Sequence, residues 1–373
     1  MISSQERDRR YCKLQSVMKN NDVKLFIAAG REGAIGRGFI RYLSDWHLWA
    51  GIGFVALPVD GNPTLILGSE SQVMWASEIN WVQDIRFSSP VIDGLINYMR
   101  ELGAPERVHI AGLSTYMLAG DVQKLHDTFP KTSFIDATSM LEQIIMIKSQ
   151  EEIDLLQQTA NIVESAMICF KQELRPGKTE REVVSKAWET ARAGGVLDGI
   201  AHISNRFPPF VHPATDYIIR KEDVIKFSME MAGPSGYWIE LSAIFSFGPP
   251  PVRELKEFLT TKKAVNAIAK LLRPGVVGYE IPLAVEKVFA EDGWDNIDRI
   301  IWDSHGIGLD VIEYPVIKGG NQTVLKENMV ISMHPGLTVG KERMGVYIQD
   351  NWVVKPGGAK PQSSWEHEWH IID

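Results

Sequence analysis

The tetrapeptide Leu174-Arg175-Pro176-Gly177 recurs unchanged later in the chain as Leu272-Arg273-Pro274-Gly275. Each copy heads a block that closes on a similar strand-like stretch. The first block closes with Val224-Ile225-Lys226-Phe227-Ser228-Met229-Glu230, and the second closes with Met329-Val330-Ile331-Ser332-Met333-His334. A fold built by duplication leaves a cleft between its halves, and here the matching strands deliver different ionisable side chains to that cleft.

The segment before the repeat alternates between strand-like and helix-like stretches. Residues 24–29, 51–57 and 64–67 are apolar runs typical of strands, and a Pro/Gly turn at 60–63 separates the last two. The pattern changes at Ser149, where a capping box with Glu152 precedes apolar residues at steps of three and four. The sequence therefore predicts two domains, 1–147 and 148–373.

Each half of the second domain follows one plan of two helices and then strands. In the first half, a capping box from Thr179 to Glu182 starts a helix that ends near Gly194. In the second half we expect helices over about 254–272 and 279–292. This pattern predicts an α+β fold in which helices cover one face of a strongly curved antiparallel sheet. Its concave face is left for chemistry.

The composition excludes several classes of protein. The chain has 373 residues, 45% of them hydrophobic, and its net charge of −8 comes without a basic run that could bind nucleic acid. No window approaches the ~20 apolar residues that span a bilayer, and the polar start is unlike a signal peptide. Two isolated cysteines, Cys12 and Cys169, argue against a disulfide framework. We expect a cytoplasmic protein with neither a membrane nor a nucleic acid as partner.

Two glutamates are predicted to meet in the cleft. Glu230 alternates with the apolar residues of its strand, so its side chain lies on the polar face. The tight turn Gly233-Pro234-Ser235-Gly236 then returns the chain through Tyr237 to Glu240. Two neighbouring carboxylates push their pKa values apart or share a cation. Taken alone, Glu230 is equally well explained as a solvated residue at a strand end.

Three histidines are candidates for the same cleft. His305 opens the string His305-Gly306-Ile307-Gly308, His334 precedes Pro335-Gly336, and His212 follows a proline-rich stretch. A His-Gly-x-Gly string by itself is more often a structural turn, and a single loop histidine usually lies on the surface. The stiff prolines near His212 and the position of His334 at the end of a repeated strand favour a functional role.

Together these residues resemble the superfamily of creatinase, prolidase, aminopeptidase P and methionine aminopeptidase, over essentially the whole chain. Tyr42-Leu43-Ser44-Asp45 and the turn at 60–63 are similar to the creatinase-type N-terminal domain. The resemblance implies that 1–147 is such a domain, of α/β type, and that 148–373 is a catalytic domain with the pita-bread fold and an internal pseudo-twofold repeat. It also implies a homodimer, in which the N-terminal segment near Trp46 closes the neighbouring cleft.

The metal-dependent members of this superfamily carry five ligands, and the resemblance transfers them one by one. The histidine is His305 and the second aspartate falls at Glu240, whereas the first falls at Met229 or, with a one-residue bulge, at Glu230. The remaining two positions, both Glu in the family, are His334 and Gln349 here. A further histidine usual in the peptidases is replaced by Ile312.

Loss of two carboxylates removes charge that would offset two divalent cations, which argues against a two-metal peptidase mechanism. The leading hypothesis is a creatinase-like, metal-independent hydrolase that needs no cofactor and acts on a small polar metabolite with an amide or amidine C–N bond. In that mechanism His212 is the general acid/base, Glu230 or Glu240 orients water, and His305 stabilises developing charge. The substrate is a small molecule, and its expected contacts are His334, Gln349, Tyr237 and Trp46.

Two alternatives stay open from the sequence. In the first, Glu230, Glu240, His305 and His334 hold one divalent transition metal, and the chain is a mononuclear Xaa-Pro-type peptidase or a lyase. In the second, the chain is a non-catalytic descendant that binds a small ligand or another protein. The exchange of polar cleft residues for other polar residues favours retained chemistry.

Overall fold

The computed structural model describes residues 2–205, 212–294, 304–339 and 344–372. The chain divides into two compact units, Met1–Ile145 and Met146–Asp373. We keep the predicted limits 1–147 and 148–373 as a proposal for the functional domains. Over the part of the chain that is described, no helix is both long and apolar enough to cross a membrane.

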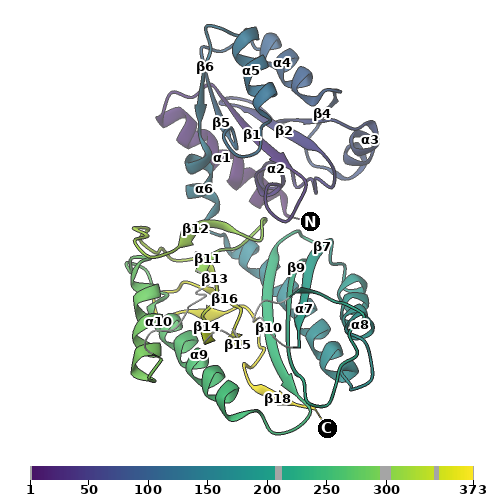
Figure 1. Cartoon of the computed structure of the whole chain (residues 1–373). Helices are drawn as coiled ribbons and strands as arrows, with labels where there is room; N and C mark the ends of the chain where they lie inside the picture. Colours follow the sequence, from purple (N-terminus) through teal and green to yellow (C-terminus); the bar gives the residue numbers. More distant parts are fainter. Residues whose placement is uncertain (1, 206–211, 295–303, 340–343, 373) are drawn as a thin grey trace. The chain divides into compact units, whose positions relative to one another are not determined.

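The first unit is built on one mixed sheet of six strands in the order β4-β3-β2-β1-β5-β6 (Figure 1). The pairs β1–β2 and β2–β3 are antiparallel, whereas β3–β4, β1–β5 and β5–β6 are parallel. The elements of this unit are α1 (Ser4–Asn20), β1 (Leu25–Arg31), α2 (Gly38–Ser44), β2 (Ile52–Pro58), β3 (Thr64–Leu67), α3 (Glu70–Ile79), β4 (Asp84–Phe87), α4 (Val91–Glu101), β5 (Arg107–Ala111), α5 (Ala119–Thr128), β6 (Ser133–Asp136) and α6 (Thr138–Ile145).

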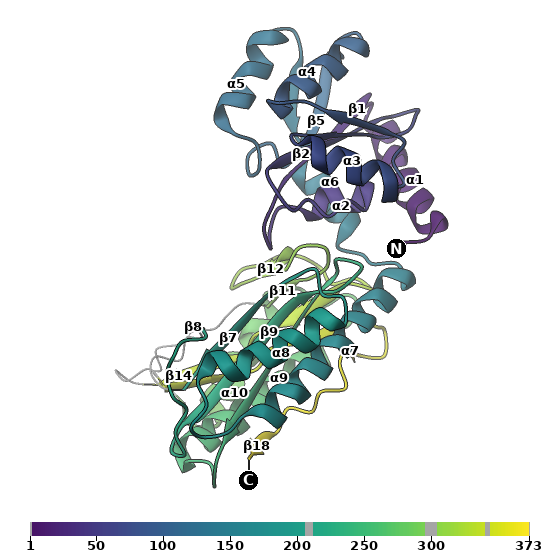
Figure 2. The same ribbon diagram turned by 90° about the vertical axis from the view of Figure 1, so that its right-hand side faces the viewer.

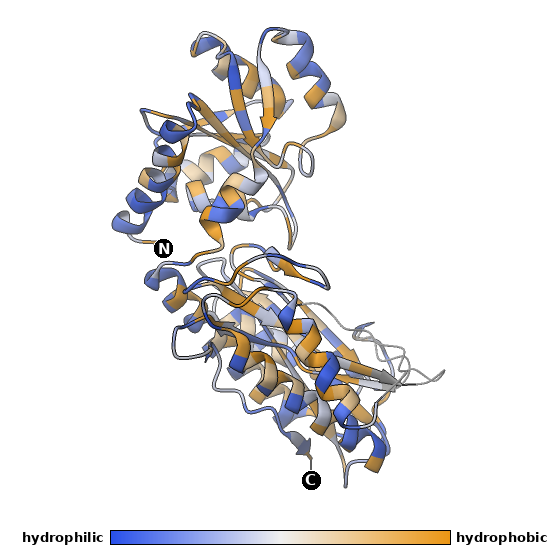
Figure 3. Cartoon of the chain, turned by 90° about the vertical axis from the view of Figure 1, so that its left-hand side faces the viewer, coloured by the Kyte–Doolittle hydropathy of each residue, from blue (hydrophilic) through white to orange (hydrophobic). Residues whose placement is uncertain are grey.

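The central strands of this sheet are buried along most of their length. All residues of β1 except Arg31 are buried, which explains why its sequence is a continuous apolar run rather than an alternating one. Leu25, Ile27 and Phe54 join the core cluster beneath α4. In Figure 3 the central strands are mostly hydrophobic, whereas the helices alternate between hydrophobic and hydrophilic residues.

The second unit repeats a plan of two helices followed by strands. Its elements are α7 (Gln150–Glu173), α8 (Glu180–Ala193), β7 (Asp198–Ser204), β8 (His212–Pro213), β9 (Val224–Ala232), β10 (Trp238–Ser246), α9 (Val252–Leu271), α10 (Glu280–Glu291), β11 (Ser304–Gly306), β12 (Glu313–Ile317), β13 (Val330–Met333), β14 (Gly336–Val339), β15 (Met344–Tyr347), β16 (Asp350–Val353), β17 (Lys360–Pro361) and β18 (Trp369–Ile371). Both capping boxes predicted from the sequence, Ser149 with Glu152 and Thr179 with Glu182, are confirmed at the starts of α7 and α8.

The predicted curved sheet is built as two five-stranded sheets, one in each half. Their strand orders are β18-β10-β9-β7-β8 and β12-β11-β13-β16-β17, and they approach each other along β10 and β16. The pairs β7–β9, β9–β10, β11–β13 and β13–β16 are antiparallel, while the terminal strand β18 adds parallel to β10. Residues of both halves can therefore meet at the seam between β10 and β16.

Helices α7 and α8 cover one face of the first sheet (Figure 2). Phe170 of α7 stacks on Phe227 of β9 with ring centroids 3.7 Å apart, and Met229 is buried on the same face. This confirms the alternation predicted for β9. Replacing one such aromatic by alanine typically costs about 3–5 kcal/mol of unfolding free energy, so this face is a major source of stability.

A buried lysine lies on the opposite face of β9. Lys226 is 8% exposed, and the helix α9 places Glu254 and the fully buried Glu257 near it. Burial lowers the pKa of Lys226 to about 8, although both glutamates act in the other direction. Burial also raises the pKa of Glu257 to about 7, since its partners Arg253 and Lys226 do not fully compensate for the loss of water.

We expect Lys226 to make stability depend on alkaline pH. The folded-state pKa of Lys226 lies below its ordinary value, because burial disfavours the charged form. The buried charge therefore lowers the unfolding free energy at pH values below about 8. This destabilisation disappears as the pH rises toward the unfolded-state pKa. The unfolding free energy of the wild type should rise by up to about 3 kcal/mol relative to Lys226→Met over this range. Urea unfolding of both proteins at several pH values checks this, and parallel profiles would contradict it.

Candidate metal and catalytic site

The β9–β10 hairpin sets two glutamates side by side. Its ladder is regular from the Val224–Ser246 pair to the Ala232–Trp238 pair, and it places Glu230 directly opposite Glu240. The turn predicted at 233–236 closes it, with Gly236 at φ 81°, where a side chain is disfavoured. Opposite residues of a ladder share a face, so Glu230 lies on the same face as Glu240, whereas Met229 lies on the core face. Of the two candidates for the position of the family's first aspartate, Glu230 is therefore the one that faces the site.

His305 comes from the other half, on the short strand β11. Both glycines of its string are required by close packing: a Cβ on Gly306 would lie 2.5 Å from the backbone oxygen of Tyr314, and one on Gly308 would lie 2.5 Å from Oε1 of Glu313. Glu313 holds this loop by accepting a hydrogen bond from the backbone N–H of Leu309 at 2.6 Å. The buried ammonium of Lys148 pairs with the other oxygen of Glu313.

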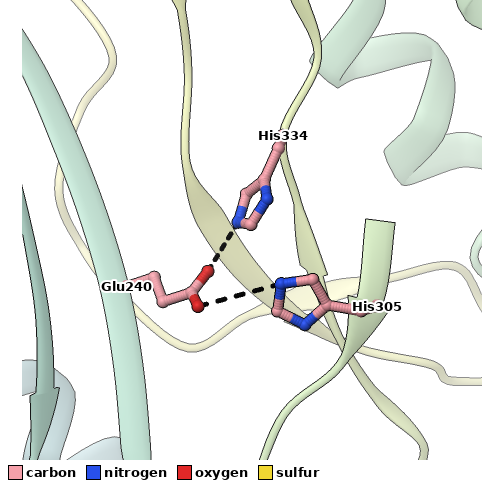
Figure 4. A group of neighbouring side chains, drawn as sticks. All are labelled: Glu240, His305 and His334. Atoms are coloured by element: carbon pink, nitrogen blue, oxygen red, sulfur yellow. Dashed lines mark hydrogen bonds and ion pairs between the residues drawn. The ribbon is translucent and has the colours of Figure 1, made fainter. Parts of the chain in front are cut away.

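His334 follows directly after β13 and contacts the same carboxylate. Its Nε2 lies 2.5 Å from Oε2 of Glu240, and the hydroxyl of Ser332 donates to that oxygen as well. The rings of His305 and His334 meet edge to face with centroids 4.8 Å apart. Figure 4 shows Glu240 between the two imidazoles, with one carboxylate oxygen directed at each.

The hydrogen bonds of His305 decide which of its nitrogens is free. Nδ1 lies 2.9 Å from the carbonyl oxygen of Gly306, which can only accept, so in the neutral ring Nδ1 carries the hydrogen. The lone pair of Nε2 therefore faces Oε1 of Glu240 at 3.8 Å. A lone pair and a carboxylate oxygen repel each other unless a cation lies between them, so this arrangement suits a bound metal ion.

Glu240, His305 and His334 form a donor set for one transition metal. One donor atom from each residue lies within 4.8 Å of the others, and all three residues are buried. Two imidazoles and a carboxylate are suitable ligands for zinc, iron or manganese. The residues present therefore fit a single divalent ion.

The charges of this group are strongly coupled. Burial alone would raise the pKa of Glu240, but the neighbouring His334 and His305 and the hydrogen bonds from His334 and Ser332 hold it below its ordinary value. Burial would lower the pKa of His334, but Glu240 raises it overall. The pKa of His305 is lowered, mainly by burial. Without a metal, Glu240 and His334 therefore stabilise each other as an ion pair, and a metal ion would displace the proton from His334.

Glu230 and Gln349 form the other side of the site. Nε2 of Gln349 donates to Oε1 of Glu230 at 2.9 Å, and the backbone N–H of Gln349 donates to Ser242 Oγ at 2.8 Å. Burial, followed by repulsion from Glu240, raises the pKa of Glu230 to about 7. The side chain of Asn351 donates to the backbone oxygen of Glu240, which ties the strand carrying these residues to β10.

The structure brings five of the sequence-predicted residues together, namely Glu230, Glu240, His305, His334 and Gln349. His212 is half-buried on β8, and among the described residues no hydrogen bond or ion pair joins it to the other five. The stretch 206–211, which contains most of the proline-rich segment before it, lies outside the described residues. Ile312 is 40% exposed and contributes no polar group.

Two predicted substrate contacts are engaged elsewhere. The hydroxyl of Tyr237 donates to Glu152 of the α7 capping box at 2.7 Å, and Tyr237 is fully buried. Trp46 is buried in the first unit, where its indole N–H donates to Gln72. We propose that both residues stabilise their own units, and the substrate-binding roles predicted for them stay untested.

The residues that brace the site are not predicted from the sequence. Ser332 could have been found, because it lies two positions before His334 on the same face of a strand. His202 of β7 is opposite Ser228 and therefore shares the face of Glu230; burial, then His212, lowers its pKa. Glu313, Asn351 and Tyr347 gave no local signal, because their roles depend on contacts between distant segments.

Comparison with known proteins identifies the family. The model of metallopeptidase family M24 matches residues 154–356, more than half of the chain. The chain therefore belongs to metallopeptidase family M24, and it is a hydrolase of the superfamily that the sequence resembles. The predicted pita-bread fold is confirmed.

Individual relatives span nearly the whole chain. The Xaa-Pro dipeptidase of Pyrococcus furiosus is 24% identical over 345 residues, which cover 90% of this chain and 96% of the relative. The solved structure of an X-Pro aminopeptidase from Thermotoga maritima superposes with a TM-score of 0.85 at 21% identity, covering 97% of this chain and 99% of the other. The prolidase of Pyrococcus horikoshii gives a TM-score of 0.81 at 20% identity, covering 96% and 99%.

Two predictions from the sequence are wrong. The metal-independent, creatinase-like mechanism conflicts with membership of a metallopeptidase family, and the expectation of no cofactor conflicts with that membership and with the donor set of Glu240, His305 and His334. The physical reason is that the exchange of Glu for His removes charge but keeps a donor. The total charge of the ligands therefore limits how many metal ions the site can hold. It does not show that the site holds no metal ion.

The packing of Gly306 generates a test of the site. Gly306→Ala should push the Tyr314 backbone away, displace His305 and weaken metal binding by about tenfold or more, with about 1–3 kcal/mol of lost stability. Gly319→Ala is the control, because a Cβ there meets nothing within 4 Å. Metal affinity by competition with a chromogenic chelator and stability by urea unfolding measure both effects. Equal metal affinity in the two variants would contradict the packing argument.

Proposed function

We propose that this protein is a metal-dependent peptidase of the Xaa-Pro type, with one divalent transition metal held by Glu240, His305 and His334. The observation that carries this proposal is the convergence of these three donors within 4.8 Å. The sequence resemblance places ligands of the family at the same three positions. The names of the relatives, Xaa-Pro dipeptidase and X-Pro aminopeptidase, support a peptide whose second residue is proline as substrate.

A metal bound at this site would polarise the carbonyl of the scissile bond and lower the pKa of a bound water. Glu230 is the residue best suited to move the proton. It lies opposite Glu240, it is only partly buried, and its pKa of about 7 lets its free carboxylate oxygen accept a proton and return it to the leaving nitrogen near neutral pH. The hydrogen bond from Gln349 fixes the position of its other oxygen.

His212 retains its proposed role as a second proton carrier. Its Nδ1 lies 2.8 Å from the carbonyl oxygen of Pro213, so Nδ1 carries the hydrogen of the neutral ring and Nε2 has the free lone pair. This tautomer suits a base. Its neighbour His202 has a pKa lowered mainly by burial and then by His212, which places a second imidazole close by.

The predicted homodimer and cytoplasmic location are part of this proposal. The support for a dimer is a set of exposed apolar side chains in the first unit, namely Trp49, Met74, Trp75 and Ile79. The support for a reducing compartment is that Cys12 and Cys169 are both free thiols.

Metal content is the direct test of the function. Protein purified without chelator should carry one transition metal per chain and cleave an Xaa-Pro dipeptide, and chelation should remove both the metal and the activity. Glu240→Gln should lower metal affinity by about tenfold or more, since it removes the only charge of the donor set. Elemental analysis and peptide hydrolysis measure these effects. Glu222→Gln, an exposed glutamate before β9, is the control. Full activity in metal-free protein would overturn the proposal.

The number of ions should depend on residues 334 and 349. The double variant His334→Glu with Gln349→Glu restores both carboxylates that the family carries there, so the charge for a second cation returns. We expect the metal content to rise from one to two per chain. The single variant Gln349→Glu shows whether a carboxylate at position 349 alone raises the metal content. A double variant that still binds one ion would show that the site is limited by something other than ligand charge.

A further inference from the structure

Each copy of the repeated tetrapeptide borders a cavity that the proposed function does not use. The α7 cavity, of about 680 Å³, lies between α7 and residues 364–372, and the α9 cavity, of about 580 Å³, lies between α9 and residues 356–359. Corresponding positions of the two copies line them, namely Ile168, Lys171 and Arg175 in the first and Asn266, Ala269 and Arg273 in the second. The two halves therefore carry equivalent cavities with different linings.

Two contacts hold residues 364–372 against α7. Glu164 accepts hydrogen bonds from the backbone N–H and the hydroxyl of Ser364, both at 2.6 Å, so both of its carboxylate oxygens are engaged. Nζ of Lys171 lies 3.2 Å from Nδ1 of His370. The His370 ring also stacks on Phe245 with centroids 5.2 Å apart. The wall of the α7 cavity is therefore fixed by packing as well as by hydrogen bonds.

Two ring N–H groups of this wall have no partner. An ammonium can only donate, so Nδ1 of His370 accepts from Lys171 and Nε2 carries the hydrogen of the neutral ring. Burial, followed by the charge of Lys171, lowers the pKa of His370 to about 4, so the ring stays neutral near pH 7. Nε2 of His370 and Nε1 of Trp365 are both buried, and neither has a hydrogen-bond partner among the described residues. Native structures rarely leave such donors unpaired.

The polar groups of the α7 cavity call for an anion. An indole N–H and an imidazole N–H need acceptor atoms, and a cationic ligand has none to offer. Lys171 and the exposed Arg175 line the same cavity and favour negative charge. A carboxylate matches this set, because its two oxygens carry about four acceptor positions and a single charge.

The rest of the lining restricts which anion fits. Glu366 and Glu368 are exposed along the same cavity and repel a dianion such as phosphate more strongly than a monoanion. Ile168 and Ile371 line it as well, and they are 48% and 51% exposed. These two side chains offer apolar surface to the body of a ligand.

We propose that the α7 cavity binds a monocarboxylate with an apolar body. Lys171 and Arg175 attract its charge, and the ring N–H groups of Trp365 and His370 donate to its oxygens. The cavity is separate from the metal ligands: His370 pairs with Phe245, which lies five residues along β10 from Glu240, or about 17 Å at the rise of a β-strand. The proposal does not depend on the proposed function.

Binding of a matched pair of small molecules tests the α7 cavity. Calorimetry on the full chain with its metal should show that 3-phenylpropionate binds about tenfold or more tighter than 3-phenylpropionamide, which has the same apolar body without the charge. Lys171→Met, Trp365→Phe and His370→Phe should each weaken binding of the acid by about tenfold, the size expected for one hydrogen bond to a charged group. The two phenylalanine variants keep an aromatic ring and remove only its N–H groups.

Two control variants separate this cavity from other sites. Lys270→Met removes one cation from the equivalent α9 cavity, and it should leave the affinity for 3-phenylpropionate unchanged. Glu240→Gln weakens the metal site and should also leave that affinity unchanged. A carboxylate bound to the metal ion is thereby distinguished from one bound in the α7 cavity.

Three results would overturn the proposal: equal affinity for the acid and the amide, an equal loss in Lys171→Met and Lys270→Met, or unchanged affinity in both phenylalanine variants. Tighter binding of 2-phenylethyl phosphate than of 3-phenylpropionate would also overturn it, because the acidic lining should select a monoanion. If Lys171→Met does not fold, Trp365→Phe and His370→Phe still decide.

Discussion

The arrangement of the site depends on one buried carboxylate. Glu240 is 1% exposed and lies on β10, the strand at which the sheet of the first half meets that of the second. Its side chain is held by Ser332 and His334, and its backbone oxygen by Asn351, all three from the second half. A buried charge is costly unless it is paired and hydrogen-bonded. The two halves must therefore dock in one register, and that register also assembles the site.

The duplication explains why the ligands differ in type while their positions are kept. Each half delivers the end of one strand to the seam, Glu230 on β9 and His334 after β13. The structure pairs His334 with Glu240 and Glu230 with Gln349. The site thus has two sides: a metal-binding side with two imidazoles, and a side with a carboxylate and an amide.

Much of the fold could be predicted because its signals are local. Capping boxes, apolar steps of three and four, and the turn at 233–236 each depend on a few consecutive residues, and the structure has the helices and the hairpin where these signals place them. The brace of Lys148, Glu313 and Leu309 could not be predicted, since it joins segments far apart in the chain. The same holds for the engagement of Tyr237 by Glu152. The loss of two acidic ligands does not exclude a metal ion, because imidazole also binds transition metals well.

From the sequence alone came the repeat, the α+β class, the resemblance to one superfamily, and the five polar residues Glu230, Glu240, His305, His334 and Gln349, because residue type and spacing are local properties. Only the tertiary structure decided that Glu230 pairs directly with Glu240 in a regular ladder, since strand register determines which residues lie opposite each other. It also decided that Glu240, His305 and His334 converge while the Gln349 amide oxygen is left without a partner in the described chain. The convergence of the donors and the state of the Gln349 amide depend on distances between side chains of the two halves. The spacing of residues along the sequence does not determine these distances.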